Sequence, residues 1–201
     1  MESIIKVLLH KLRFLPISLG FFKIGPYTLV DRRYISIIGK KYIEIGKYCR
    51  ILAGLRLEAI DSYAGKKFKP QIIIEDNVCI NQNFHCTCAS LVKIGKGTSI
   101  TANCGVFDIV HPYTDITNNP REQEIQSIPV IIGENCLIGM NSVILPGVNL
   151  GNHVIVGANS VVYRGFYGDY CVLVGAPARI VRKYDKSLKK WIKVHEDNKC
   201  N

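Results

Sequence analysis

Residues 132–167 read IGENCL IGMNSV ILPGVN LGNHVI VGANSV VYRGFY. An aliphatic residue opens every unit of six, and the fifth place of the first five units is small or β-branched. Neither an α-helix nor an alternating strand repeats strictly every six residues. Three short strands, each followed by a turn, instead close a triangular coil of eighteen residues. We therefore expect a parallel β-helix in which Leu150 stacks on Ile132 and Val156 on Ile138.

The period extends in both directions from this stretch. After GDYCVL the units resume with VGAPAR, where we expect Val174 and Ile180 to stay in register. Weaker coils precede it, and their expected inward residues are Ile45, Ile51, Leu57, Ile74, Ile80, Cys86, Ile94, Ile100 and Val106. Residues 61–70 interrupt the register, and residues 112–129 form the longest interruption. A long loop pushed out of a regular solenoid is usually functional or disordered.

The composition predicts one folded domain with small terminal additions. We expect an amphipathic basic helix over residues 1–24, a β-helix over 25–184, and a basic helix and tail over 185–201, with Leu188, Trp191 and Ile192 on the apolar face of the last helix. Residues 1–24 carry too many charges for a spanning helix and lack a cleavage site. That segment packs against the protein or lies on an anionic membrane surface.

The formal net charge is +10, which favours anionic ligands. The sequence carries no zinc-finger spacing, RRM-type motif or recognition helix, so we expect no nucleic-acid partner. Cys49, Cys104 and Cys136 occupy the small fifth place of the repeat, and the pair Cys86 and Cys88 lacks a second pair at zinc spacing. The eight cysteines therefore read as reduced structural thiols, and no metal is expected.

The I-G-x-x-x-x units, the V-G-A-P-A-R ending and the His111-Pro112 pair resemble the hexapeptide-repeat acetyltransferases, particularly the galactoside, maltose and nodulation-factor branch. The resemblance covers about residues 70–184. It implies a left-handed β-helix, an exception to the usual right-handed crossover. The amino-terminal segment differs from the helical cap of the galactoside enzymes. It is more similar to acetyltransferases of bacterial capsule and O-antigen synthesis.

Acetylating a hydroxyl with a thioester requires a base, a donor to the oxyanion and a held cofactor. The resemblance implies that His111 is the base, because similar enzymes carry their catalytic histidine in a His-Pro pair at this junction. It also implies that Asn81 positions the acceptor sugar, with Asn83 as a weaker candidate. Asp108 either orients the imidazole or accepts from a sugar hydroxyl. Glu124 lies near the acceptor or is a solvated loop acid.

The remaining histidines, His10, His85, His153 and His195, read as ordinary surface residues. For the acetyl-CoA donor, the phosphates require cations. Arg164 and the A-R-x-x-R ending, which holds Arg179 and Arg182, match the phosphate-contacting places of the family, and Lys183 follows directly. The pantetheine arm is expected along the coils near Met140 and Ala158. Leu137 replaces a family tryptophan, which alters the pocket wall.

These residues predict an acetyl-CoA-dependent O-acetyltransferase that modifies a sugar or glycan hydroxyl by direct attack, because no G-x-S-x-G elbow is present. An N-acetyltransferase of an amino-sugar nucleotide is the alternative enzyme, and a non-catalytic β-helix scaffold is the alternative of another class. The loop after His111 lacks the histidines of a γ-class carbonic anhydrase, and a serine acetyltransferase would carry a long helical amino-terminal domain. The resemblance further implies a homotrimer, and we expect a cytoplasmic location, with peripheral contact to the inner face of the cell membrane as an option.

Overall fold

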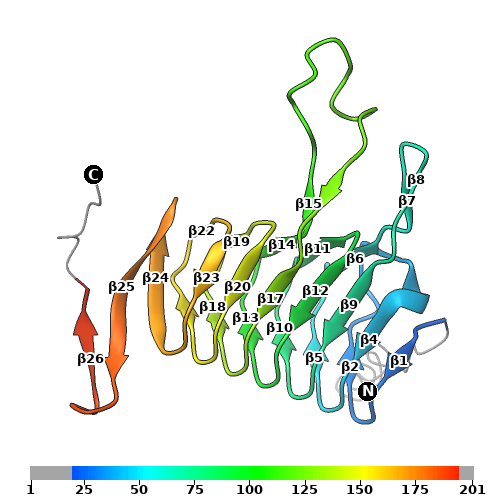
Figure 1. The fold of residues 1–201 in the computed structure, drawn as a ribbon. Coiled ribbons are helices and arrows are strands. Elements are labelled where there is room, and N and C mark those ends of the chain that lie inside the picture. The colour runs from blue at the N-terminus through cyan, green and yellow to red at the C-terminus, as the bar shows by residue number, and fades with distance from the viewer. Residues whose placement is uncertain (1–19, 195–201) are drawn as a thin grey trace, which may run out of the picture.

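The computed structural model describes residues 20–194 as a left-handed parallel β-helix, a triangular prism with three sheets as its sides (Figure 1). Each coil of chain passes through sheet A, sheet B and sheet C in turn. We name the edges of the prism the A–B, B–C and C–A corners. Residues 1–19 and 195–201 lie outside the described residues, and most of the expected amino-terminal helix falls there.

Sheets A and B contain one strand from every coil and sheet C one from each of the first six coils, and sheet B adds the antiparallel strands β25 and β26. In spatial order sheet A contains β1 (Lys23–Ile24), β4 (Ile43–Ile45), β9 (Gln71–Ile74), β12 (Leu91–Ile94), β17 (Val130–Ile132), β20 (Val148–Leu150) and β23 (Gly165–Tyr167). Sheet B contains β2 (Leu29–Val30), β5 (Arg50–Ile51), β10 (Cys79–Ile80), β13 (Ser99–Ile100), β18 (Leu137–Ile138), β21 (Ile155–Val156), β24 (Cys171–Gly175), β25 (Ala178–Asp185) and β26 (Lys190–Lys193). Sheet C contains β22 (Val161–Val162), β19 (Val143–Ile144), β14 (Gly105–Phe107), β11 (His85–Cys88), β6 (Arg56–Ala59) and β3 (Ser36–Ile38).

Three short elements complete the chain. A 3-10 helix η1 (Lys40–Tyr42) precedes β4. Strands β7 (Ser62–Tyr63) and β8 (Lys66–Lys67) form a hairpin in the interruption at 61–70. Strands β15 (Ile109–Val110) and β16 (Gln126–Ser127) pair antiparallel at the base of the long loop.

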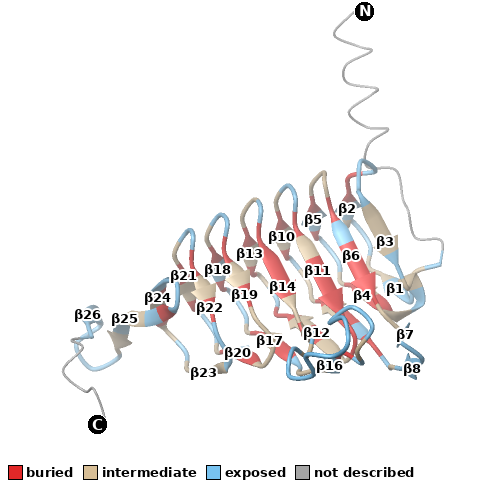
Figure 2. Cartoon of the chain, turned by 90° about the horizontal axis from the view of Figure 1, so that it is seen from above, coloured by how far each residue is buried: buried red, intermediate tan, exposed pale blue. Residues whose placement is uncertain are grey.

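The core is the stack of inward aliphatic residues that the period predicts (Figure 2). Ile132 aligns with Leu150, and Ile138 with Val156, which confirms the stacking of residues eighteen apart. The expected inward residues of the earlier coils are also buried, and they are Ile45, Ile51, Leu57, Ile74, Ile80, Cys86, Ile94, Ile100 and Val106. The small fifth-place residues Cys136, Ser142, Val148, Val154 and Ser160 are buried beside them.

Asparagine and glycine form the tight turns at the B–C corner. At the B–C corner Gly54 and four asparagines adopt positive φ. The asparagine amides form a ladder, since Asn83 donates to Asn103 (2.9 Å), Asn103 to Asn141 (3.0 Å) and Asn141 to Asn159 (3.0 Å). Asparagine tolerates the left-handed region better than most residues, so the corner is formed at little strain.

Three predictions about the termini and the register are wrong. The β-helix begins by β1 at Lys23, inside the segment expected to be helical. Val156 aligns with Leu173 instead of Val174, because the turn between Val162 and Gly165 is one residue shorter than in earlier coils. In the described part of 185–201 there is no helix, because Lys190–Lys193 forms β26, which pairs antiparallel with β25.

All seven cysteines in the described part of the chain are free, and six are buried. Burial raises the pKa of the thiols of Cys49, Cys86, Cys104 and Cys136. Protonated buried thiols are inert and act as small apolar residues.

The stacking leaves no room for side chains at several glycines. A Cβ on Gly133 would lie 2.5 Å from the carbonyl carbon of Gly151 in the next coil, whereas a Cβ on Gly168 meets nothing within 4 Å. Gly133→Ala should therefore destabilise the protein by about 1–3 kcal/mol, and Gly168→Ala should leave stability unchanged. Thermal melting of both variants checks this, and equal midpoints would show that the coils yield locally.

Candidate active site

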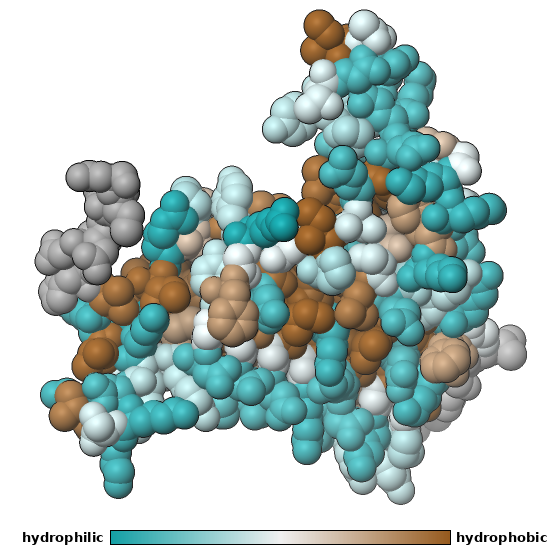
Figure 3. Space-filling view, viewed as in Figure 1, coloured by the Kyte–Doolittle hydropathy of each residue, from teal (hydrophilic) through white to brown (hydrophobic). Residues whose placement is uncertain are grey.

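Two segments leave the prism at the C–A corner and stand above the edge of sheet C (Figures 1 and 2). We call residues 61–69, with β7 and β8, and residues 109–127, with β15 and β16, the crest. The hydroxyl of Tyr63 donates to the carbonyl of Arg121 at 2.5 Å, which joins the two segments. Glu124 is exposed and forms an ion pair with Lys66 at 3.1 Å, so its observed contact is within the crest. The surface of the crest is mainly hydrophilic (Figure 3).

The long loop of the crest has its own internal structure. Asp115 accepts hydrogen bonds from the backbone and hydroxyl of Thr117 and from the amide of Asn118. These bonds lower the pKa of Asp115 to about 2. At the base, Ile125 is buried. The loop is therefore a folded element that holds a fixed position above the prism.

His111 lies where the chain enters this loop, directly after β15, and it is exposed. Its ring meets the ring of Tyr63 edge-on, with 5.6 Å between centroids. No described residue forms a hydrogen bond with the imidazole, so both ring nitrogens face the surroundings. Tyr63 therefore limits the orientation of His111 while leaving its nitrogens available.

Asp108 is buried, and its carboxylate binds the turn at residues 89–91. It accepts hydrogen bonds from the backbone nitrogens of Ala89 (2.7 Å), Ser90 (2.7 Å) and Leu91 (2.9 Å), and from the hydroxyl of Ser90 (2.8 Å). These contacts tie the C–A turn of one coil to the base of the crest on the next. Asp108 is thus a positioning residue for the crest in the observed geometry, and it does not contact the imidazole.

Asn81 lies at the opposite end of the sheet C strands, in the B–C turn that precedes β11. Met140 and Ala158 occupy the same corner on later coils, where the backbone of Asn159 donates to the carbonyl of Met140 at 2.8 Å. Met140 is 49% exposed, so its side chain lies at the surface of this corner. The structure brings these three predicted residues together along one edge of the prism.

Arg164 lies with His111 on the other side, because it follows β22 at the C–A corner. Its side chain crosses Gly147, where an added Cβ would lie 2.8 Å from the Cγ of Arg164. These predicted residues therefore fall into two groups, at the B–C and the C–A corner, that are separated by the width of sheet C. One chain does not assemble them into one pocket.

The cations at the carboxyl end lie on strand β25. Arg179 pairs with Val174 and Arg182 with Val172, and an irregular register between Val172 and Leu173 lets both arginines share the outer face of sheet B. Lys183 pairs with the buried Cys171 and therefore points to the opposite face. The structure separates Lys183 from the two arginines.

A polar group on the outer face of sheet C was not predicted from the sequence. His85, expected to be an ordinary surface residue, lies 3.0 Å from the hydroxyl of Thr87 and 3.7 Å from the carboxylate of Glu58. Glu58 is only 8% exposed. The sequence does show alternating outward residues in 56–59 and in 85–88. Only the stacking of the coils shows that these two segments are neighbours.

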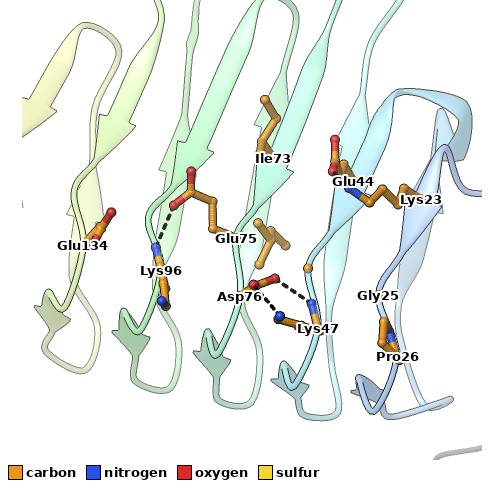
Figure 4. Close-up of a pocket in the computed structure, with 12 residues that line it drawn as sticks. Lys23, Gly25, Pro26, Glu44, Lys47, Ile73, Glu75, Asp76, Lys96 and Glu134 are labelled. Atoms are coloured by element: carbon orange, nitrogen blue, oxygen red, sulfur yellow. Dashed lines mark hydrogen bonds and ion pairs between the residues drawn. The ribbon is translucent and has the colours of Figure 1, made fainter.

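A pocket of about 470 Å³ on the outer face of sheet A is lined by none of the predicted site residues (Figure 4). Its charges pair with each other: Lys23 contacts Glu44 at 2.6 Å, and Asp76 accepts from the backbone of Lys47 at 2.9 Å. Glu75 accepts from the backbone of Lys96. Paired surface charges explain this hollow without a ligand.

Residues 20–194 contain neither a metal-binding cluster nor a membrane-spanning helix. No group of three or more His, Cys, Asp or Glu side chains there is placed to hold a metal ion. No helix among those residues is long and apolar enough to cross a membrane.

Comparison with known proteins identifies the family. Residues 129–164 match the family model described as the hexapeptide repeat of succinyl-transferase. The chain is 35% identical over 148 residues to the putative lipopolysaccharide biosynthesis O-acetyl transferase WbbJ of Escherichia coli K12, covering 70% of this chain and 71% of that protein. The chain belongs to the hexapeptide-repeat acetyltransferases, and it is an acyltransferase by family.

Solved structures share the fold. AntD, an N-acyltransferase from Bacillus cereus, in complex with dTDP and 3-hydroxybutyryl-CoA, superposes with a TM-score of 0.73 at 20% identity, covering 88% of this chain and 92% of that one. A serine-to-alanine variant of AntD, in complex with dTDP-4-amino-4,6-dideoxyglucose and coenzyme A, gives 0.67 at 21% identity, covering 91% of each chain. At this identity the likeness establishes the fold.

The contacts of Asp108 predict a stability effect. Asp108→Asn should lower stability by about 1–3 kcal/mol, because buried backbone donors lose a charged acceptor. Thermal melting measures this, and the pH dependence of the remaining activity should match wild type. A variant of unchanged stability with a shifted pH profile would instead assign Asp108 to orienting His111.

Proposed function

We propose that this protein transfers the acetyl group of acetyl-CoA to a hydroxyl of a sugar, in the synthesis of a bacterial surface polysaccharide. The observation that carries the proposal is an exposed histidine with free ring nitrogens at the base of the crest, in a chain 35% identical to a putative lipopolysaccharide O-acetyl transferase. Acyl-CoA and coenzyme A in the AntD complexes, which have the same fold, support the choice of donor. Because the donor is acetyl-CoA, we place the reaction in the cytoplasm. Peripheral membrane contact would involve residues 1–19, which lie outside the described residues.

The reaction requires no covalent enzyme intermediate. One ring nitrogen of His111 takes the proton of the acceptor hydroxyl as its oxygen attacks the thioester carbonyl. The tetrahedral intermediate collapses, the C–S bond breaks, and the thiolate of CoA takes the proton back from the imidazolium. Asn81 positions the acceptor through its amide, which both donates and accepts hydrogen bonds.

The split of the predicted residues supports assembly into a homotrimer. Asn81 and His111 lie at opposite ends of the sheet C strands of one chain. A face-to-edge arrangement of prisms around a threefold axis would bring the B–C corner of one chain to the C–A corner of the next. Each site is then completed by two chains, and the pantetheine arm runs along Met140 and Ala158 between them.

A second reaction, N-acylation of an amino-sugar nucleotide, is favoured by one specific likeness. An AntD variant with this fold is known in complex with dTDP-4-amino-4,6-dideoxyglucose. The product distinguishes the two reactions, because an ester is cleaved by mild alkali and an amide is not.

His111→Ala should lower acetyl transfer by about 100-fold or more, since a general base contributes that much. Release of CoA thiol measures the rate, and the affinity for CoA should be unchanged. His153→Ala, which removes an exposed histidine at the A–B corner, is the matched control. Near-full turnover by a folded His111→Ala protein would reject the assignment, and no thiol release by wild type would favour a scaffold.

The arginines on β25 should recognise the phosphates of CoA. Arg179→Ala or Arg182→Ala should raise the KM for acetyl-CoA about tenfold and leave kcat almost unchanged, because a phosphate remote from the thioester is bound alike in ground and transition states. The variants should also lose the wild-type preference for acetyl-CoA over its 3′-dephospho analogue.

Arg50→Ala is the control, since Arg50 is exposed toward the far end of the same sheet. If both β25 variants keep the preference, the phosphate contacts lie elsewhere, at Arg164 or Lys183.

A further inference from the structure

The polar group of sheet C is an unusual feature on a face that is otherwise apolar. Its members are Ser36, Arg56, Glu58, His85 and Thr87, from β3, β6 and β11. On the following coils the outward places of this sheet are held by Phe107, Val143 and Val161. Five polar side chains thus gather on three successive coils, the last of which carries Asn81 and lies next to the coil of His111.

Glu58 is the centre of this group. Its Oε1 accepts from Nε of Arg56 at 2.6 Å and from the hydroxyl of Ser36 at 3.1 Å. Burial opposes ionisation of Glu58, yet the bond from Arg56 lowers its pKa. Its Oε2 has only long contacts, 3.5 Å to Thr87 and 3.7 Å to His85. The ionised carboxylate therefore keeps one oxygen with only long contacts on the outer face of the sheet, where Glu58 is 8% and Thr87 7% exposed.

His85 and Phe107 extend the polar group toward the next coil. The two rings meet edge-on with 5.0 Å between centroids, and the ring of Phe107 lies over Gly105, where an added Cβ would be 2.7 Å away. Burial, followed by the charge of Arg56, lowers the pKa of His85, so the imidazole is neutral near pH 7. A neutral imidazole both donates and accepts hydrogen bonds.

The position of the polar group matches its chemistry. Glu58, Thr87 and Phe107 lie near the carboxyl ends of β6, β11 and β14, so they form a floor beside the C–A corner, at the end of sheet C that carries His111. The crest rises along one edge of this floor (Figures 1 and 2). A sugar presents hydroxyls that donate and accept, together with an apolar face of C–H groups. Carboxylate, hydroxyl, imidazole and an adjacent aromatic ring complement each of these.

We propose that Glu58, Thr87, His85 and Phe107 form the subsite that binds the acceptor sugar. Glu58 Oε2 and the Thr87 hydroxyl bond to adjacent hydroxyls of a pyranose, and Phe107 contacts its C–H face. This inference rests on the proposed function, because it places the acceptor beside His111 of the same chain and Asn81 of the neighbouring chain. The subsite holds the sugar, and His111 removes the proton of the hydroxyl that is acylated.

The test uses the full-length protein and two-substrate kinetics. Methyl glycosides of glucose, galactose, mannose and N-acetylglucosamine, and bacterial lipopolysaccharide, serve as probe acceptors. With the acceptor that wild type uses best, Glu58→Gln and Thr87→Val should each raise the acceptor KM at least tenfold, while the KM for acetyl-CoA stays within twofold of wild type. Thr87→Val preserves shape, so it keeps the test informative if Glu58→Gln fails to fold.

Glu75→Gln is the matched control, because Glu75 forms a similar ion pair, with Lys93 at 2.8 Å, on the outer face of sheet A. It should leave both KM values unchanged. Unchanged acceptor KM in folded Thr87→Val would overturn the subsite while leaving acetyl transfer intact. A wild-type protein that acetylates none of the probes would contradict the proposed function, and the subsite with it.

Discussion

The structure depends on the inward stacking of one aliphatic side chain per strand, in parallel register, along the axis of the prism. Neighbouring strands lie about 4.8 Å apart, so a feature at one corner recurs at the same corner on the next coil. Backbones at the corners touch, which is why Gly133 meets Gly151 directly. The asparagine ladder and the two columns of site residues all follow from this regular repeat.

The sequence predicts the regular part of the fold well because each coil requires an inward aliphatic residue at the same places. Ile74, Ile80 and Cys86 were identifiable as inward residues although their units are imperfect. The last coil was not predictable to the residue, since the period selects Val174, whereas the shorter turn between Val162 and Gly165 moves the inward place to Leu173. The carboxyl-terminal pattern of Leu188, Trp191 and Ile192 fits a helix as well as a strand. Strand β25 forms because the last strand of sheet B offers an open edge, which a local pattern does not reveal.

The candidate site was predictable where a resemblance gave a residue its context, and less so elsewhere. His111 lies in an exposed place that suits a base, but its distance across sheet C from Asn81 depends on the winding of the chain. Asp108 stands three residues before His111, yet its carboxylate binds the turn at 89–91 on the neighbouring coil. Likewise Glu58 and His85 meet only because the segment between them returns the chain to the same sheet.

Complementation between two inactive variants tests whether each active site is shared by two chains. His111→Ala and Asn81→Ala chains with different tags are produced together, and assemblies that contain both are purified through both tags. In a cyclic trimer, one of the three interfaces then has an intact histidine facing an intact asparagine, so mixed assemblies should recover about a third of wild-type turnover. Each variant assembled by itself should be nearly inactive. Mixed assemblies no more active than the separate variants would contradict a site formed between chains.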